Sequence, residues 1–158
     1  MPNAVWYDVA TEVRTKVLTL SLPLPAGGNL PSAQVYLRKV LTDRSATLPF
    51  VMIAPAGVET VEPYSNEREL YGYPVAVAVA AASNQDHELD TDDEEYLRWR
   101  ELILLKFVGK RLGVTDVVEA RPCRVEPGPV LDPALWQSAN LWVQFFTLRF
   151  FAVLTRSS

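Results

Sequence analysis

Cysteine and histidine are nearly absent from this 158-residue chain, in which Cys123 and His87 are the only residues of their kinds. One cysteine excludes a disulfide within the chain, and it also excludes a cysteine-rich metal cluster. A histidine that acts as a general base needs a nucleophile beside it in a closed site, and the sequence indicates no such partner for His87. We therefore predict that the chain is not an enzyme, and no cofactor is predicted for it.

Positive charge and long apolar runs are also scarce. The chain has 15 Lys and Arg against 19 Asp and Glu, a net charge of −4, which argues against a general affinity for nucleic acid backbones. The most apolar stretch, residues 142–154, is interrupted by Gln144, Thr147 and Arg149, and it is shorter than the roughly 20 residues that span a bilayer. The first residues lack the basic and then apolar pattern of a secretory signal. We expect a protein that is made and used in a cytoplasm, without a membrane partner.

A chain of this length, 49% apolar, is predicted to form one domain over residues 1–158. Apolar residues in the first segment recur at spacings of three and four, which predicts an N-terminal amphipathic helix. Asn3 is the expected N-cap, and Pro23 and Pro25 are expected to end the element. The predicted helix face consists of Val5, Val9, Val13, Lys16, Val17 and Leu20.

Three strands are predicted in the first half of the chain. Residues 34–41 alternate in part, and residues 48–54 form a continuous apolar run that is typical of a strand covered on both faces. Residues 73–82 are predicted to form the central strand, with three valines on one face and three alanines on the other. Because alanine is a poor strand former, we expect a helix to pack closely on the alanine face. Residues 59–70 are polar and charged, which predicts an exposed excursion between strands.

A second helix is predicted after a run of acidic residues. Thr91 and Glu94 have the spacing of a capping box, and Gly113 is the expected stop. The predicted apolar seam consists of Leu97, Leu104, Val108 and Leu112, flanked by Tyr96, Trp99, Ile103 and Phe107.

Two more strands are predicted over residues 114–125 and 141–156, separated by an irregular proline-rich loop over residues 126–133. The last strand has an apolar face made of Phe146, Leu148, Phe150, Ala152 and Leu154. Its other face is mixed, and we expect it to be partly exposed or to meet a partner chain; it consists of Phe145, Thr147, Arg149, Phe151, Val153 and Thr155. The predicted fold class is α+β, with a single mixed, mainly antiparallel sheet on which an N-terminal helix and one main helix pack.

The acidic stretch around His87 allows two interpretations. Asp86, Glu88, Asp90 and Asp92 alternate like the ligands of a hard cation, but the glycine and the terminal glutamate of an EF-hand loop are missing. The favoured interpretation is a solvated loop whose charges suit the positive end of the helix that follows. Weak binding of a divalent cation is the alternative.

Cys123 also has two interpretations. Arg121 and Arg124 would lower the pKa of its thiol if they lay close to it. The favoured interpretation is a strand cysteine without a chemical role, because the sequence indicates no histidine partner for it.

Four short phrases, over residues 48–57, 73–77, 99–103 and 130–135, resemble segments of the small tail-completion, or tail-terminator, proteins of tailed bacteriophages. The segment Leu48-Pro49-Phe50-Val51-Met52-Ile53, followed by Pro55-Ala56-Gly57, resembles their early strand and turn. Tyr73-Pro74-Val75-Ala76-Val77 resembles their central strand, and Trp99-Arg100-Glu101-Leu102-Ile103 resembles their main helix. Val130-Leu131-Asp132-Pro133-Ala134-Leu135, before the last strand, resembles their C-terminal part. The resemblance covers most of the chain from Leu48 onward.

This resemblance implies one mixed or antiparallel sheet with helices packed on it, and a structural role without catalysis. Tail-terminator members of the family form a hexameric ring that caps the tail tube and joins it to the head. The implied partners are other copies of the chain, the tail tube protein, a neck or head-completion protein, and DNA that passes through the lumen without specific binding. The implied location is the virion, assembled in the host cytoplasm.

Two segments, residues 59–70 and 126–137, are where we expect the ring contacts. The candidate interface residues are Tyr64, Asn66, Glu67, Arg68, Asp132, Leu135 and Trp136. Trp136 has a second interpretation, as cover for the local core. The acidic stretch is expected to line the lumen, where negative charge would repel DNA phosphates; the candidates are Asp86, Glu88, Asp90, Asp92 and Asp93.

Other functions stay open on the sequence alone. One is another head-tail connector or neck protein, and a second is a small binding module of a larger complex without a virus. The least favoured is a metal-dependent enzyme that uses Asp86, His87, Glu88 and Asp90.

Overall fold

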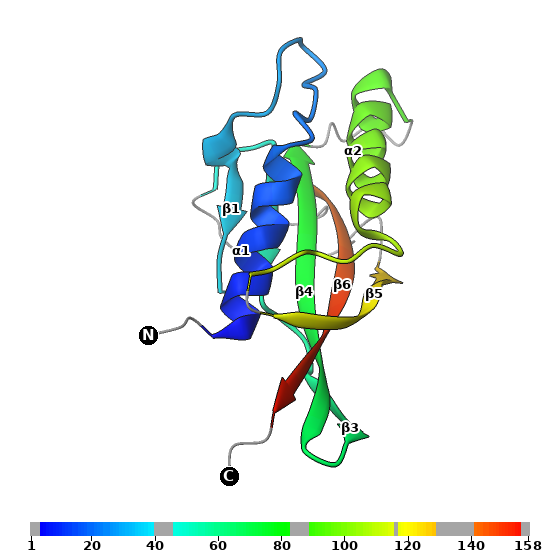
Figure 1. The fold of residues 1–158 in the computed structure, drawn as a ribbon. Coiled ribbons are helices and arrows are strands. Elements are labelled where there is room, and N and C mark those ends of the chain that lie inside the picture. Colours follow the sequence, from blue (N-terminus) through cyan, green and yellow to red (C-terminus); the bar gives the residue numbers. More distant parts are fainter. Residues whose placement is uncertain (1–3, 40–45, 83–88, 116, 129–140, 156–158) are drawn as a thin grey trace.

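The chain folds as an α+β protein, as the sequence predicts (Figure 1). A computed structural model describes residues 4–39, 46–82, 89–115, 117–128 and 141–155. Within these ranges it contains two α-helices, one 3₁₀ helix and a six-stranded mixed sheet. The elements are α1 (Val5–Leu18), η1 (Ser32–Gln34), β1 (Val35–Leu37), β2 (Phe50–Ala54), β3 (Thr60–Ser65), β4 (Arg68–Ala82), α2 (Thr91–Phe107), β5 (Val118–Pro127) and β6 (Leu141–Thr155).

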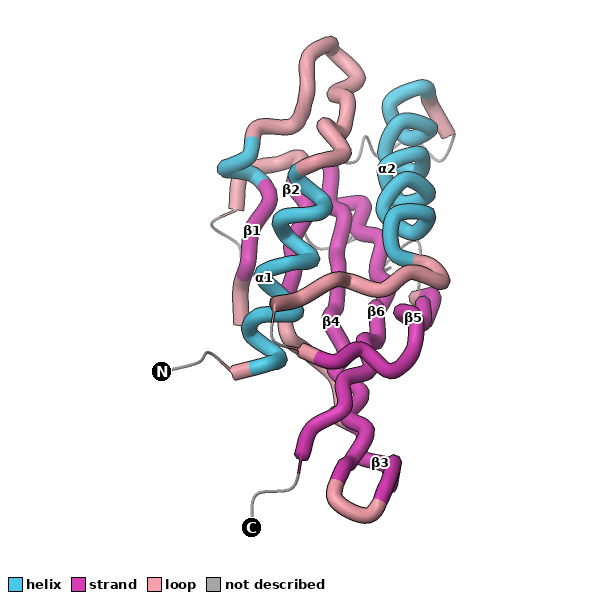
Figure 2. Tube along the Cα trace, viewed as in Figure 1, coloured by secondary structure: helices cyan, strands magenta, loops and turns pink. Residues whose placement is uncertain are grey.

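The sheet is organised around β4 and β6, which pair antiparallel from Arg68↔Thr155 to Ala82↔Leu141. The strand order is β1-β2-β4-β6-β5, and only the β1–β2 pair is parallel. β3 pairs with the first part of β4, whereas β2 pairs with its second part, so these two strands share one edge of β4 (Figure 2).

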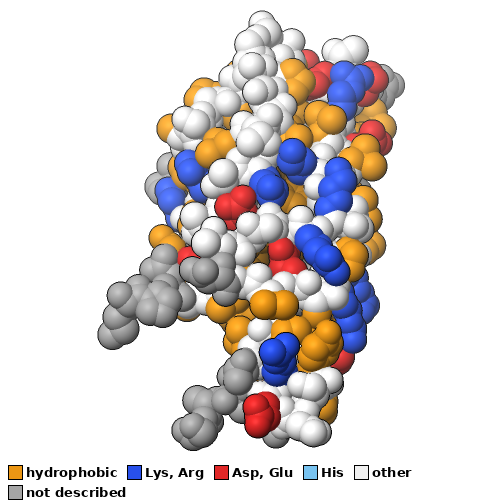
Figure 3. All heavy atoms as spheres, viewed as in Figure 1, with side chains coloured by type: hydrophobic (Ala, Val, Ile, Leu, Met, Phe, Trp, Pro, Cys, Tyr) orange, Lys and Arg blue, Asp and Glu red, His pale blue; other side chains and the backbone are white. Residues whose placement is uncertain are grey.

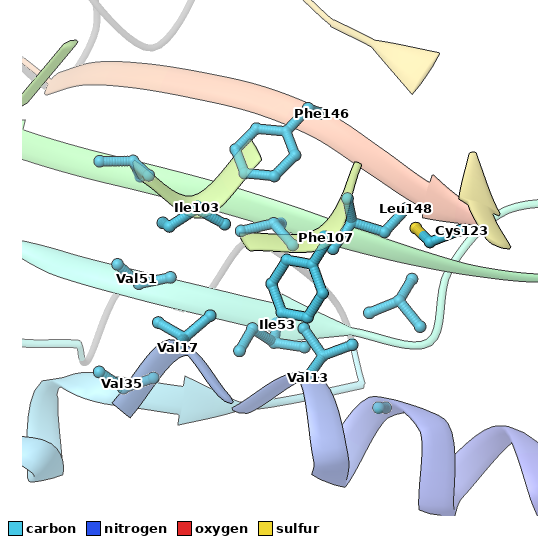
Figure 4. Close-up of a cluster of buried hydrophobic side chains, with 14 of the residues drawn as sticks. Val13, Val17, Val35, Val51, Ile53, Ile103, Phe107, Cys123, Phe146 and Leu148 are labelled. Atoms are coloured by element: carbon cyan, nitrogen blue, oxygen red, sulfur yellow. The ribbon is translucent and has the colours of Figure 1, made fainter. Parts of the chain in front are cut away.

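Both helices lie on the same face of the sheet (Figure 1). The main core is formed there by side chains from α1, α2 and the sheet, which point toward one another in Figure 4. Val75, Val77 and Val79 of β4 belong to this core, so the predicted helix on the alanine face is wrong. The valines are the larger side chains, and their face buries more apolar area beneath the helices.

The alanine face of β4 is buried among large side chains of the neighbouring strands. Ala78 and Ala80 cluster with Phe50 and Met52 of β2 and with Val143 of β6. These larger residues lie opposite the alanines on the neighbouring strands. Their side chains fill the space around the small alanine side chains.

The predicted periodicity of α1 is confirmed, since Val9, Val13 and Val17 are all buried. The predicted N-cap is wrong: the N-cap position is Ala4, which makes no side-chain capping bond, and Asn3 lies outside the described residues. The indole nitrogen of Trp6 donates a hydrogen bond to the Pro74 carbonyl at 2.8 Å, which fixes the start of α1 to β4.

The capping box of α2 is shifted by one residue from the prediction. Asp90, not Thr91, is the N-cap, and its side chain and that of Asp93 each accept a hydrogen bond from the other's backbone nitrogen. Asp and Thr are both good N-caps, so spacing alone does not separate the two registers. The helix ends at Phe107 rather than near Gly113, because the chain reverses at Gly109 with φ of 67°.

The buried stripe of α2 consists of Trp99, Ile103 and Phe107, which the sequence had placed on the flank of the seam. Trp99 also donates from its indole nitrogen to the Pro23 carbonyl at 2.7 Å. Of the predicted seam, Val108 is exposed and Leu112 is buried outside the helix, while Leu97 and Leu104 are half-buried.

The strand boundaries differ from the prediction mainly in the exposed parts. β2 is buried throughout, as expected, and the apolar face of β6 meets the helices through Phe146, Leu148 and Phe150. The predicted excursion over residues 59–70 is instead β3 and the start of β4. β5 begins four residues later than predicted, at Val118 rather than residue 114. Within the described ranges no helix is long and apolar enough to cross a membrane.

Two residues of equal size on α2, one buried and one exposed, test this packing. Ile103 is 0% exposed and Leu105 is 65% exposed. We expect Ile103→Ala to lower the free energy of unfolding by about 3 kcal/mol, because it leaves a cavity beneath the helix. Leu105→Ala is expected to change it by less than about 0.5 kcal/mol. Urea unfolding measures both, and equal losses would contradict the orientation of α2.

Candidate functional site: a projecting β-hairpin

A β-hairpin extends beyond the helices and is exposed to solvent along one whole strand (Figure 1). It consists of β3 and the first residues of β4, paired from Thr60↔Gly72 to Ser65↔Arg68, with Asn66 and Glu67 in the turn; we call residues 60–72 the hairpin. Every residue of β3 is exposed. The opposite edge of β4 continues to pair with β6 down to Thr155, so the hairpin is part of an extended ribbon rather than a detached loop.

Three large apolar side chains on or next to β3 face solvent. Val58 is 78% exposed, Val61 52% and Tyr64 53%. Scattered exposed apolar residues are ordinary, but three within seven positions of one projecting segment form a concentrated surface. Hydrophobic side chains also gather at the base of the hairpin in Figure 3.

Arg149 of β6 holds the base of the hairpin in place. Its Nε donates to Oε1 of Glu126 on β5 at 2.9 Å, and its Nη1 donates to the Val58 carbonyl at 2.9 Å. The side chain runs past Gly72, where a Cβ would lie 3.3 Å from Cδ of Arg149 and would collide with Oγ1 of Thr60. Gly72 is therefore required for close passage of these side chains across β4.

A second link crosses the face of the sheet that carries no described helix. Nη2 of Arg121 on β5 lies 3.6 Å from Oε2 of Glu62 on β3, and its guanidinium lies over the ring of Phe151 at 5.5 Å. Both charged side chains are about half-exposed, so this ion pair contributes little to stability.

Three aromatic residues support the hairpin on the helix-bearing face. The rings of Tyr71 and Tyr73 stack with centroids 6.0 Å apart, and Trp6 of α1 packs on Tyr73 at 5.9 Å. Burial, followed by the nearby charge of Glu59, raises the pKa of Tyr73 to about 12. Tyr73 thus stays a neutral phenol at physiological pH.

The predicted interface residues fall into two groups. Tyr64, Asn66, Glu67 and Arg68 lie together at the far end of the hairpin. The remaining three, Asp132, Leu135 and Trp136, lie outside the described residues.

The described acidic candidates, Asp90, Asp92 and Asp93, lie beyond the end of β4 that is opposite the hairpin, at the start of α2. Asp90 and Asp93 form the capping box, so their carboxylates satisfy backbone amides, and Asp92 is exposed. A hollow of about 240 Å³ lies beside them, lined by Leu48, Pro49, Ala82, Asp90, Asp92, Asp93 and Tyr96. Asp86, His87 and Glu88 lie outside the described residues, and among those described no group of three His, Cys, Asp or Glu is placed to hold a metal.

The buried position of Cys123 contradicts the reactive-thiol alternative. Burial raises the pKa of its thiol to about 12, and its sulfur lies 3.7 Å from the Arg124 carbonyl. The neighbouring arginines are exposed and do not lower this pKa, so the thiol stays protonated.

Sequence reasoning missed Arg149 and Gly72. The signal that could have found them is the glycine itself, because a glycine inside a strand indicates close approach of another group. Which group approaches depends on pairing between segments far apart in the chain, as in the 91-residue separation of Arg149 and Val58.

No protein-family model matches this chain, and no curated protein matches it either.

Arg149 and Arg124 stand opposite each other in register on β6 and β5 and make a matched pair for testing the hairpin base. Arg149→Gln is expected to lower the free energy of unfolding by about 2 kcal/mol, because Glu126 loses its buried partner. Amide hydrogen exchange in residues 60–65 should also become faster. Arg124 is exposed, so Arg124→Gln should change neither quantity measurably. Unchanged exchange in the Arg149 variant would contradict the anchoring role.

The two raised pKa values predict a loss of stability in alkali. The ordinary pKa is 9.0 for the Cys123 thiol and 10.0 for Tyr73, and both rise to about 12 in the folded chain. The unfolded chain therefore loses these protons first, and the stabilisation is complete below pH 9 and lost as the pH approaches 12. In urea unfolding across this range, the double variant Cys123→Ala, Tyr73→Phe should lose stability less steeply than the wild type. An unchanged slope would contradict the pKa values.

Proposed function

We propose that this chain is a structural virion protein of a tailed bacteriophage, a tail terminator that forms a ring, caps the tail tube and joins it to the head. The observation that carries the proposal is the hairpin, in which a whole strand and the apolar residues Val61 and Tyr64 are exposed. Exposed apolar side chains gathered on one projecting strand are typical of an interaction surface, and a partner that covers the strand explains them.

The resemblance to tail-terminator proteins supports the same proposal. Three of its four phrases lie in or beside β2, β4 and α2, and the fourth, residues 130–135, lies outside the described residues. The α+β fold agrees with the architecture that the resemblance implies. We infer a role in assembly rather than catalysis, with no resident cofactor.

In this proposal the ring is a homohexamer located in the virion and assembled in the host cytoplasm. One side of the ring meets the tail tube protein, and the other meets a neck or head-completion protein. DNA passes through the lumen without specific binding, and no membrane takes part. The exposed carboxylate of Asp92, with its neighbours at the start of α2, is the part of the proposed acidic lumen that lies within the described residues.

The hairpin and a distant exposed leucine provide the test. Val61→Ser, Tyr64→Ser should weaken ring assembly about tenfold or more, because truncating central apolar contacts of an interface costs about 1–2 kcal/mol each. Leu89→Ser, at a residue 73% exposed before α2, is the matched control and should leave assembly unchanged.

Light scattering with negative-stain imaging measures assembly, with and without added tail tube protein. Closed rings of the wild type, alone or with tube protein, are expected. A wild type that stays monomeric in both conditions would contradict the proposed function.

A further inference from the structure

The hairpin and the residue that precedes it are strongly acidic. Residues 59–69 contain four glutamates and one arginine, which gives a net charge of 1 − 4 = −3. Glu59, Glu62 and Glu67 are exposed. Only Glu62 of these three has an ion pair with a described residue, so Glu59 and Glu67 are available to another molecule.

The opposite edge of the same sheet is basic. The end of α2, the turn after it and β5, residues 106–124, contain five cations against Asp116 and Glu119, which gives 5 − 2 = +3. We call the five cations the basic edge: Lys106, Lys110, Arg111, Arg121 and Arg124. Lys and Arg side chains follow one another along the side of the molecule that carries α2 and β5 in Figure 3.

Most of the basic edge has no partner among the described residues. Lys110, Arg111 and Arg124 are exposed, and their side chains make no ion pair or hydrogen bond with the described residues. The carboxylate of Glu119, which could neutralise them, instead accepts hydrogen bonds from the backbone nitrogens of Leu112 and Gly113, both at 2.6 Å. Lys110, Arg111 and Arg124 are therefore positive charges without a counter-charge among the described residues.

The two surfaces occupy opposite edges of one strip of sheet. At the hairpin the local strand order is β3-β4-β6-β5, so β3 and β5 are its two outer strands. An acidic surface on one edge and a basic surface on the other cannot pair with themselves. They can pair head to tail with the opposite surface of another copy, the arrangement that generates rings when the rotation closes.

Apolar side chains complement each other in the same way. Val61 and Tyr64 are exposed on β3, and Val118, at the start of β5, is 63% exposed. Pro63 within β3 lacks a backbone N–H, so the outer edge of β3 does not provide a continuous ladder for another strand. Side-chain contacts, charged and apolar, are therefore the chemistry by which this edge recognises a partner.

From these observations we propose that the hairpin of one copy docks on the basic edge of the next copy, with Glu59 and Glu67 facing Lys110, Arg111 and Arg124. The contact rests on the proposed ring function and specifies its subunit interface. The continuous strand pairing β3-β4-β6-β5 within each chain holds the two surfaces in a fixed relation across the strip.

Charge reversal tests this contact on the full chain. The hairpin variant Glu59→Lys, Glu67→Lys and the edge variant Lys110→Glu, Arg111→Glu should each weaken assembly about tenfold or more, because like charges then face each other. Exposed charges elsewhere give matched controls: Glu101→Lys on α2 and Lys39→Glu after β1 should assemble as the wild type does. Circular dichroism and thermal unfolding establish that every variant is folded.

Mixing the two reversed variants in equal amounts is the decisive measurement. The lysines on the hairpin of one variant then meet the glutamates on the edge of the other, and both kinds of contact become attractive again. Assembly by light scattering should return to near the wild-type level in the mixture. Wild-type assembly should also weaken between about 0.1 M and 1 M salt, as the screening length falls from about 10 Å to about 3 Å.

The outcomes separate this contact from the proposed function. If both charge-reversed variants still form rings as the wild type does, the contact is overturned and the tail-terminator function stands. Rings that survive while the hairpin variant loses only binding to tail tube protein would assign the hairpin to that partner and overturn the contact. Failure of the mixture to recover would also overturn it. A wild type that forms no ring even with tube protein overturns both.

Discussion

The long pairing between β4 and β6 is the constraint on which the rest of the structure depends. Each strand has 15 residues, so the ladder is about 50 Å long. The 17 residues of α2 extend only about 26 Å, and the 14 of α1 about 21 Å. Helices of this length cover one part of the ladder and leave the other part uncovered. The projecting hairpin follows from this mismatch in length, with β3 pairing where no helix reaches.

The two faces of the sheet are buried by contacts of different kinds. On the helix-bearing face, Val75, Val77 and Val79 meet the buried stripe of α2, so large apolar groups from separate elements interlock. On the other face, Ala78 and Ala80 are enclosed by larger neighbours such as Met52 within the sheet itself. A small side chain in a strand thus need not indicate a helix above it, because flanking strands can supply the missing volume.

The sequence predicts elements that depend on local pattern and misses features that depend on distant pairing. Periodicity and continuous apolar runs predict the order of the elements, and they predict helix α1 and strand β2 in particular. They do not predict β3, because Glu62 and Pro63, in its middle, are poor strand formers, and pairing with β4 overrides that preference. For the candidate site, the exposure of Tyr64 and of residues 66–68 is a local property, which the polar composition of the segment predicts. The anchoring of that segment by Arg149 required knowledge of which strand lies beside it.

The burial of Cys123 has a practical consequence for following assembly. It is the only thiol in the chain, and its inward position and raised pKa make it a poor nucleophile while the protein is folded. A cysteine introduced at Asn66, in the turn of the hairpin, would be the single accessible thiol. A fluorescent maleimide could then be attached there without altering the buried core. Its anisotropy and emission would report directly on when the hairpin turn becomes covered by another molecule.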